Sequence, residues 1–148
     1  MNLEQLIQYG SLIISIFLFI LKRKGMKKFI PAGLFACFYA NVVCHIAMTL
    51  NWWDYPSKFT ELPVNCVVAP VMAIFWIRYF SSTLKKQIIW AFLFTSLLMV
   101  FEFIIEKYTH IINYHNGYNW FHSFLLWFFS WFIWLKFHRW FNSDTTSL

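Results

Sequence analysis

Five apolar stretches alternate with short polar connections along the whole chain. They cover residues 3–21, 29–50, 62–80, 88–105 and 120–137. Each is close to the roughly 20 mainly apolar residues that a helix needs to cross a bilayer. Their apolar positions are continuous and do not alternate with a period of two, so a membrane β-barrel is not expected. The pattern predicts an all-α, polytopic membrane protein whose five transmembrane helices form a single domain over residues 1–148.

Basic residues predict how these spans are oriented. Ten of the twelve Lys and Arg side chains fall within residues 22–28, 78–86 and 136–139, which share one side of the membrane if five spans alternate in direction. Because short cytoplasmic loops carry the excess of Lys and Arg, we expect this side to be cytoplasmic. The N-terminus and the connections 51–61 and 106–119 then lie outside, and the C-terminus lies inside.

Composition favours lipid as the main surrounding of the chain. The 148 residues are 60% hydrophobic and 12% charged, whereas soluble domains average about 25% charged residues. The net charge of +6 does not indicate nucleic-acid binding, because the basic residues flank apolar spans and do not line one polar face. We expect the lipid bilayer as a partner and no nucleic acid. Glu4 precedes the first stretch and the basic cluster follows it, which is the reverse of a cleavable signal peptide.

Acidic residues at the end of the fourth span are the first candidates for chemistry. Glu102, Glu106 and His110 are spaced by four, so a continuing helix would stack them on one face. An acid within a span is costly and by default indicates function. Glu106 could instead be a solvated boundary residue, with Glu102 bonded to a neighbouring helix. A metal site is not predicted, because glutamate and histidine at helical spacing are a partial ligand set.

Other spans place polar side chains at a similar depth. With the predicted orientation, one outward-facing pocket could be formed by Glu102, Glu106, His45, Asn41, Asn65, His110 and His122. Pockets between helices are common ligand sites. The alternative is that these groups make only hydrogen bonds between helices. Within the set, His45 is the candidate titrating partner of Glu102.

Local signals predict three further features. Pro70 lies in the middle of the third span, where it cannot donate to the carbonyl of Cys66 and should kink the helix. Asn116-Gly117 predicts a turn, and the preceding Ile111-Ile112 predicts a short interfacial helix. The three cysteines are expected to be small buried hydrophobes, although a disulfide between Cys44 and Cys66 is left open.

The fifth span is crowded with aromatic residues, which predict a surface facing lipid or another subunit. They are Phe121, Phe124, Trp127, Phe128, Phe129, Trp131, Phe132 and Trp134. A membrane-protein partner or a second copy of the chain could bind there. No cofactor is predicted, since the sequence has no phosphate loop, nucleophile elbow or HExxH motif.

A family resemblance is carried by the run from Phe101 to Thr109, followed by Ile112, Tyr114 and Asn119-Trp120, together with Tyr55-Pro56. These residues resemble a largely uncharacterised family of small multi-pass membrane proteins of spore-forming Gram-positive bacteria. The resemblance implies a helical protein of the bacterial plasma membrane. It implies no catalytic role, but it includes both Glu102 and Glu106.

Three function classes follow, in decreasing order of support. The first is binding or transport of a small polar ligand, a cation or a proton through the outward-facing pocket. The second is an accessory subunit of a larger membrane complex. The third is a membrane enzyme that acts on lipid with Glu102 and His45 as acid and base; no nucleophile or metal signature supports it, so no catalytic residue is assigned.

Overall fold

The structure is a computed structural model, and it describes residues 3–55, 61–80 and 83–143. It is built from helices, with one pair of short strands. The elements are α1 (Leu3–Leu21), the 3₁₀ helix η1 (Lys27–Phe29), α2 (Ile30–Thr49), β1 (Trp53–Asp54), α3 (Glu61–Pro63), the π-helix η2 (Val64–Val68), α4 (Ala69–Phe80), α5 (Leu84–Tyr108), β2 (Asn113–Tyr114) and α6 (Trp120–Ser143). Since α3, η2 and α4 follow one another without a break, the described residues form five helical segments, and the predicted all-α class is confirmed.

Three of the described helices are long and apolar enough to cross a membrane. They are Leu3–Leu21, Lys27–Thr49 and Leu84–Tyr108. The segment Val64–Phe80 is apolar but shorter. Helix α6 is long enough, but its tryptophans, histidines and serines lower its mean hydropathy. Three such helices are compatible with a membrane protein.

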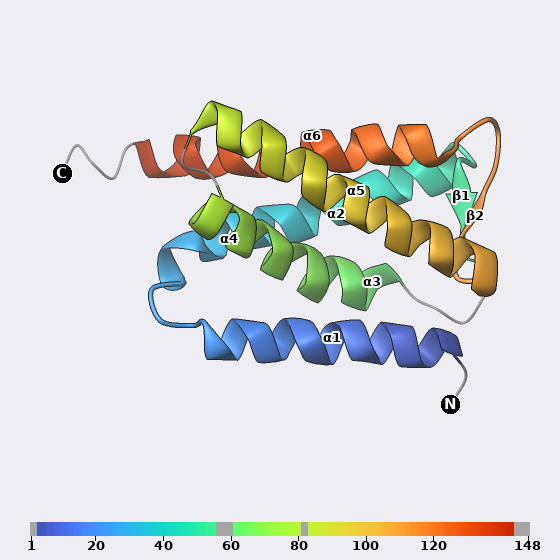
Figure 1. Cartoon of the computed structure of the whole chain (residues 1–148), viewed down its shortest axis with the longest axis horizontal. Helices are drawn as coiled ribbons and strands as arrows, with labels where there is room; N and C mark the ends of the chain where they lie inside the picture. The colour runs from blue at the N-terminus through green and yellow to red at the C-terminus, as the bar shows by residue number, and fades with distance from the viewer. Residues whose placement is uncertain (1–2, 56–60, 81–82, 144–148) are drawn as a thin grey trace.

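Successive segments run in opposite directions, so the two chain ends lie at opposite ends of the bundle (Figure 1). We call the end that carries β1 and β2 the hairpin end, and the opposite end the basic end. Helix α1 lies along one side, where it packs chiefly against η2. The three predicted basic clusters all belong to the basic end: Lys22, Arg23, Lys24, Lys27, Lys28, Arg78, Lys85, Lys86, Lys136 and Arg139. Lys58 lies outside the described residues.

Small residues allow α2 and α4 to approach each other closely. Ala32, Ala36 and Ala73 are fully buried at this contact. A Cβ atom added to Gly33 would lie 2.8 Å from Cδ1 of Ile74, so only glycine fits there without a shift. This use of small side chains is typical of helix packing in membranes, where close van der Waals contact replaces the hydrophobic driving force.

An aromatic core fills the basic half of the bundle. The Trp76 Nε1–H donates to the Trp131 carbonyl at 3.0 Å, and the Trp131 Nε1–H donates to Thr95 Oγ1 at 3.0 Å. Trp131 and Trp134 are 3% and 1% exposed, so the expectation that the span-five aromatics form an outer surface is wrong for these two. They are buried because α6 packs against α2, α4 and α5 at once. Phe121 and Phe129 remain exposed.

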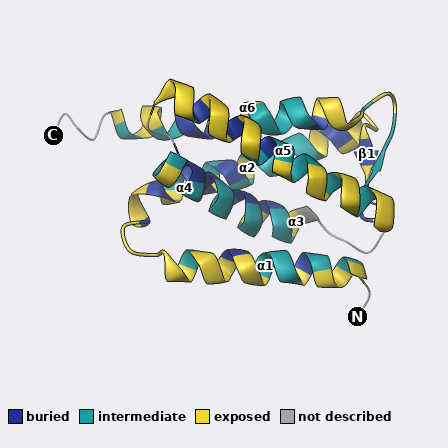
Figure 2. Ribbon diagram, viewed as in Figure 1, coloured by how far each residue is buried: buried dark blue, intermediate teal, exposed yellow. Residues whose placement is uncertain are grey.

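Apolar side chains also cover the outside of the bundle. Figure 2 shows exposed positions along α1 and along much of α5. They include Ile13, Phe17, Phe92 and Leu97. Contiguous exposed apolar surface of this extent is rare on soluble monomers and is typical of a surface that meets lipid.

Where the sequence predicts a kink at Pro70, the structure has the π-helix η2, which ends two residues before it. The Ala69 N–H bonds to the carbonyl of Val64, five residues back. Proline has no N–H for the carbonyl of Cys66, and a wider turn accommodates that loss. Asn65 and Cys66 lie within η2, so the irregular turn faces the region of the predicted pocket.

A two-stranded ladder closes the hairpin end. Trp53 pairs with Tyr114 and Asp54 with Asn113, in antiparallel register. The predicted turn is confirmed, because Asn116 and Gly117 both have positive φ and the Tyr118 N–H bonds to the His115 carbonyl. The predicted interfacial helix at Ile111-Ile112 is wrong. This segment forms a bend that leads into β2, and Ile111 is buried.

Candidate functional site

A central cavity of about 370 Å³ lies between the helical segments in the hairpin half of the bundle. Each segment contributes a stripe of residues at helical spacing. On α6, for example, the lining residues are Ser123, Leu126, Trp127, Ser130 and Trp134. Most of the lining is apolar, with Val43, Val68, Met72, Leu98 and Ile105 among its walls.

Glu102 is the acidic side chain of this cavity. The Ser123 Oγ–H donates to its Oε1 at 2.7 Å, which ties α6 to α5. The Trp127 side chain lies within hydrogen-bonding reach of the same carboxyl group. These two contacts hold the carboxyl group at the cavity wall and leave it able to meet a ligand.

Asn65 forms a second polar group on the opposite wall. Its Nδ2 donates to the Cys44 Sγ at 3.3 Å, and this sulfur lies 3.7 Å from the Tyr55 hydroxyl. Asn65 is buried in η2. The irregular turn before Pro70 therefore presents a polar side chain to the cavity.

Three further lining groups are donors that make no hydrogen bond within the described residues. They are the Trp53 Nε1–H, the Tyr114 hydroxyl and the Trp134 Nε1–H. Trp53 is 6% exposed, and it lies at the hairpin end beside Tyr114, its partner in the ladder. A buried donor without an acceptor costs about 1–3 kcal/mol. These three donor atoms are themselves covered by neighbouring side chains, so an acceptor in the cavity reaches them only when those side chains move.

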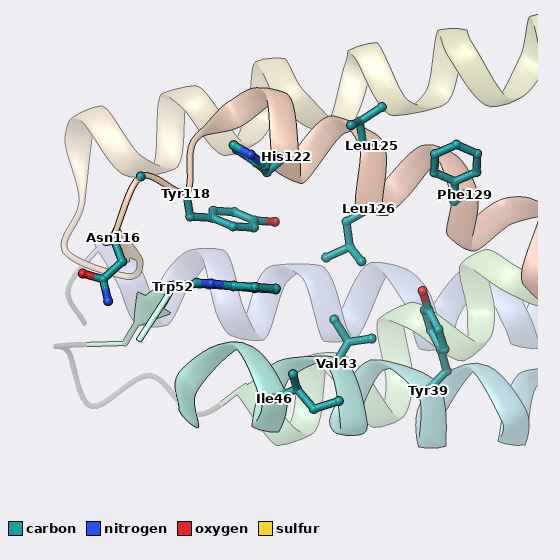
Figure 3. A pocket seen from close by; sticks show the side chains of 11 residues that line it. Tyr39, Val43, Ile46, Trp52, Asn116, Tyr118, His122, Leu125, Leu126 and Phe129 are labelled. Carbon is teal, nitrogen blue, oxygen red and sulfur yellow. The ribbon is translucent and has the colours of Figure 1, made fainter. Parts of the chain in front are cut away.

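A second hollow, of about 460 Å³, lies between α2 and α6. Figure 3 shows its lining, with Trp52 and Tyr118 at the hairpin end and Phe129 farther along α6. The Trp52 and Tyr118 rings stack at 5.8 Å between centroids. Burial raises the pKa of Tyr118 to about 12, so its phenol is uncharged at neutral pH. We call this hollow the lateral groove.

The structure brings two of the seven predicted site residues to the central cavity, namely Glu102 and Asn65. His122 lines the lateral groove instead, where it stacks on Tyr118 at 5.5 Å and contacts Asn119. Asn119 also accepts from the Phe121 N–H at 3.0 Å, so it caps α6. His122 is thus oriented by a helix cap.

The other four predicted residues do not line the cavity. Asn41 donates to the Cys37 carbonyl within its own helix, and His45 is exposed. Glu106 accepts from the Trp120 Nε1–H. His110 is exposed beyond the end of α5, with its backbone N–H donating to Glu4 Oε1 at 3.0 Å. Because α5 ends at Tyr108, the predicted stack of Glu102, Glu106 and His110 on one continuing helix does not form.

The cysteines lie differently from the sequence prediction. None of the three is fully buried, and Cys66 is exposed. The Sγ atoms of Cys37 and Cys66 are 3.1 Å apart, whereas Cys44 is bonded to Asn65. The pairing left open between Cys44 and Cys66 is therefore not the one that the fold brings together. Among the described residues, no group of three or more His, Cys, Asp and Glu side chains could hold a metal ion.

Sequence reasoning missed Ser123, Trp53, Tyr114 and Trp134 as site residues. Ser123 could have been found, because a serine at the outer end of span five lies at the depth of Glu102. The ladder of β1 and β2 brings Trp53 and Tyr114 together, although they are 61 positions apart in the sequence. No local pattern marks such a pairing.

Comparisons of the chain with protein-family models, with curated proteins and with solved structures find no match. The resemblance to the membrane proteins of spore-forming bacteria therefore stays a prediction from the sequence.

Proposed function

We propose that all five helical segments cross a bacterial plasma membrane, with the hairpin end outside and the basic end in the cytoplasm. The gathering of ten basic residues at one end of the bundle supports this orientation. The shorter segment Val64–Phe80 and the aromatic α6 cross as members of the bundle, packed against α2 and α5.

In this orientation, the chain binds a small ligand in the central cavity and can pass it between the cavity and the outer side of the membrane. The observation that carries this proposal is the Glu102 carboxyl group, which lines the cavity and is held there by Ser123 at 2.7 Å. A carboxylate in an apolar surrounding favours a partner that donates hydrogen bonds or carries positive charge. A polar ligand group, a cation or a proton at Glu102 meets that requirement.

An accessory role in a larger complex is the second candidate, and α1 favours it. This helix packs chiefly against η2, and most of its large apolar side chains are exposed. A partner helix could therefore pack along α1. The surface first expected for this role is reduced, because Trp131 and Trp134 of α6 are buried.

Acid–base chemistry on lipid is the least supported function. Its two expected groups were Glu102 and His45, but His45 is exposed on α2 and does not line the cavity. Glu102 contacts Ser123 instead. The geometry supports binding at Glu102 in preference to a reaction there.

Replacement of Glu102 by Gln tests the binding function, with Glu106→Gln as the matched control. Both acids lie on α5 one turn apart, but Glu106 bonds to Trp120 outside the cavity. The protein is taken from its membrane in polymer-bounded native nanodiscs, so that no detergent enters the cavity. Bound small molecules are then identified by native mass spectrometry and by extraction.

The wild type and Glu106→Gln should retain a bound molecule that Glu102→Gln loses by about tenfold or more, since a hydrogen bond to a charged group is worth about 1.5–3 kcal/mol. Equal retention by all three proteins at equal abundance would remove Glu102 from the site. A complete absence of bound molecules in the wild type would overturn the proposed function.

Site-directed labelling tests the orientation. In a background with the three native cysteines replaced by alanine, Asn116→Cys at the hairpin turn should react with a membrane-impermeant maleimide on intact cells. Lys24→Cys, in the connection between α1 and η1, should react only after the cells are opened. The reverse pattern would mean that the basic end faces outside.

A further inference from the structure

The central cavity and the lateral groove are separated by a thin wall. Tyr39, Val43 and Leu126 line both hollows. The groove lies between α2 and α6, and its outer members Ile46 and Phe129 are 47% and 56% exposed. In the proposed membrane orientation, such apolar exposed side chains face acyl chains. The groove is therefore a side entrance from the bilayer toward the cavity.

The cavity has a long and narrow form. Its lining on α6 extends from Ser123 to Trp134, which is eleven residues or about 16 Å along the helix axis. Its volume is about 370 Å³. Between the two ends the walls are formed mainly by Val68, Met72 and Leu98 and similar side chains. An apolar lining of this length accommodates an extended hydrocarbon chain.

The hairpin end of the cavity carries the groups that a lipid head would meet. The Trp53 Nε1–H and the Tyr114 hydroxyl are donors without acceptors, and Glu102 supplies carboxyl oxygens. A head with both hydroxyl and carbonyl oxygens can donate to the Glu102 carboxyl oxygens, and it accepts from the two donors once the side chains that cover them move. A phosphate or carboxylate head would lose its hydration in this mainly apolar cavity, and no Lys or Arg among the lining residues would compensate for that loss.

We propose that the cavity takes up a single-chain lipid with an uncharged, oxygen-bearing head, such as a glycerol monoester, from the bilayer through the groove between α2 and α6. Leu126, Val43 and Tyr39 are the side chains that must move aside. The inference rests on the proposed binding function and names its ligand class and entry route. The head lies at Glu102, and the chain extends toward Trp134.

Photo-crosslinking in native nanodiscs tests this inference. The probe is a monoacylglycerol with a diazirine in its chain, compared with the matching diazirine fatty acid and diazirine phosphatidylglycerol. Labelled residues are mapped by peptide mass spectrometry. The monoacylglycerol should label residues of the cavity, such as Met72 and Leu98, about tenfold more than either anionic probe, because a charged head loses its hydration there without gaining a cationic partner.

The entry route is tested by Leu126→Trp, with Phe121→Trp as control. Both residues are on α6, but Phe121 lines neither hollow. Leu126→Trp should reduce cavity labelling about tenfold while labelling of Phe129 in the groove persists, and Phe121→Trp should change neither. Val43→Trp repeats the test from α2. Circular dichroism and thermal unfolding show whether each variant remains folded.

Equal or stronger cavity labelling by the anionic probes would overturn the ligand class. Unchanged cavity labelling in folded Leu126→Trp and Val43→Trp would overturn the route. Both failures differ from a failure of the proposed function. In these cases a molecule lost on Glu102→Gln but not on Glu106→Gln would still mark the cavity as a binding site for another ligand.

Discussion

The two halves of the bundle are built from the same helices but differ in how they treat polar groups. In the basic half, the buried indole N–H groups of Trp76 and Trp131 both have acceptors, and the indole N–H of Trp134, which has none within the described residues, lies where the cavity lining ends. In the hairpin half, the helices enclose a cavity, and the donors of Trp53 and Tyr114 have none within the described residues. A satisfied, closely packed region provides stability. A region with unpaired donors around a cavity is less stable, as is usual for a binding site.

The largest expected effect contrasts two tryptophans one turn apart on α6. Trp131 is buried in the basic half and bonded to Thr95, whereas Trp127 lines the cavity. Trp131→Ala should lower the free energy of unfolding by about 3–5 kcal/mol. Trp127→Ala enlarges an existing hollow and should cost roughly 2 kcal/mol or less. Unfolding in mixed micelles measures both, and equal losses would contradict the difference between the halves.

Enlarging a side chain on α2 should change stability less than Trp131→Ala does. The result should differ between the two halves. Ala36 is fully buried, and Ala40, one turn later, lines the cavity. Ala36→Leu should destabilise the protein by about 1–3 kcal/mol through overpacking. The larger side chain of Ala40→Leu can enter the cavity, so this variant should leave the stability of the protein unchanged while it reduces ligand retention. A destabilisation by Ala40→Leu as large as that by Ala36→Leu would mean that the cavity is filled by protein.

The features of the two halves can also be predicted from the sequence to different extents. Span positions follow from the continuous apolar runs, and α1 matches the predicted residues 3–21. Pro70 predicts a kink in the third span, and the structure has the π-helix η2 next to it. The direction in which a polar residue points within a span is harder to predict, because hydropathy does not encode it. Glu102 and His45 were predicted at one depth, yet the rotation of α2 turns His45 outward.

The aromatic residues of α6 illustrate the same limit. Their composition is equally suited to lipid and to a packed core, since both surroundings are apolar. The choice depends on contacts with Trp76 and Phe94, which come from other segments. Likewise, Trp53 becomes a site residue through its pairing with Tyr114. Such contacts arise from tertiary structure, so sequence periodicity alone cannot predict them.

The smallest expected effect concerns the hydrogen bond that holds Glu102. Ser123→Ala removes its donor and should lower the free energy of unfolding by about 0.5–1.5 kcal/mol. Ser11→Ala is the control, since Ser11 also lines the cavity but bonds to the Gln8 carbonyl of its own helix. It should change stability by a few tenths of a kcal/mol. Should Ser11→Ala prove the more damaging variant, Ser123 would not be the residue that holds the site.

The most direct test of the account is an experimental structure of the protein in lipid nanodiscs. It should show the hairpin half open, with elongated density from the Glu102 carboxyl group along α6 toward Trp134, and acceptor atoms beside the Trp53 and Tyr114 donors. A hairpin half in which Trp127 and Leu126 close over Glu102, with no density between α5 and α6, would contradict the proposed binding cavity.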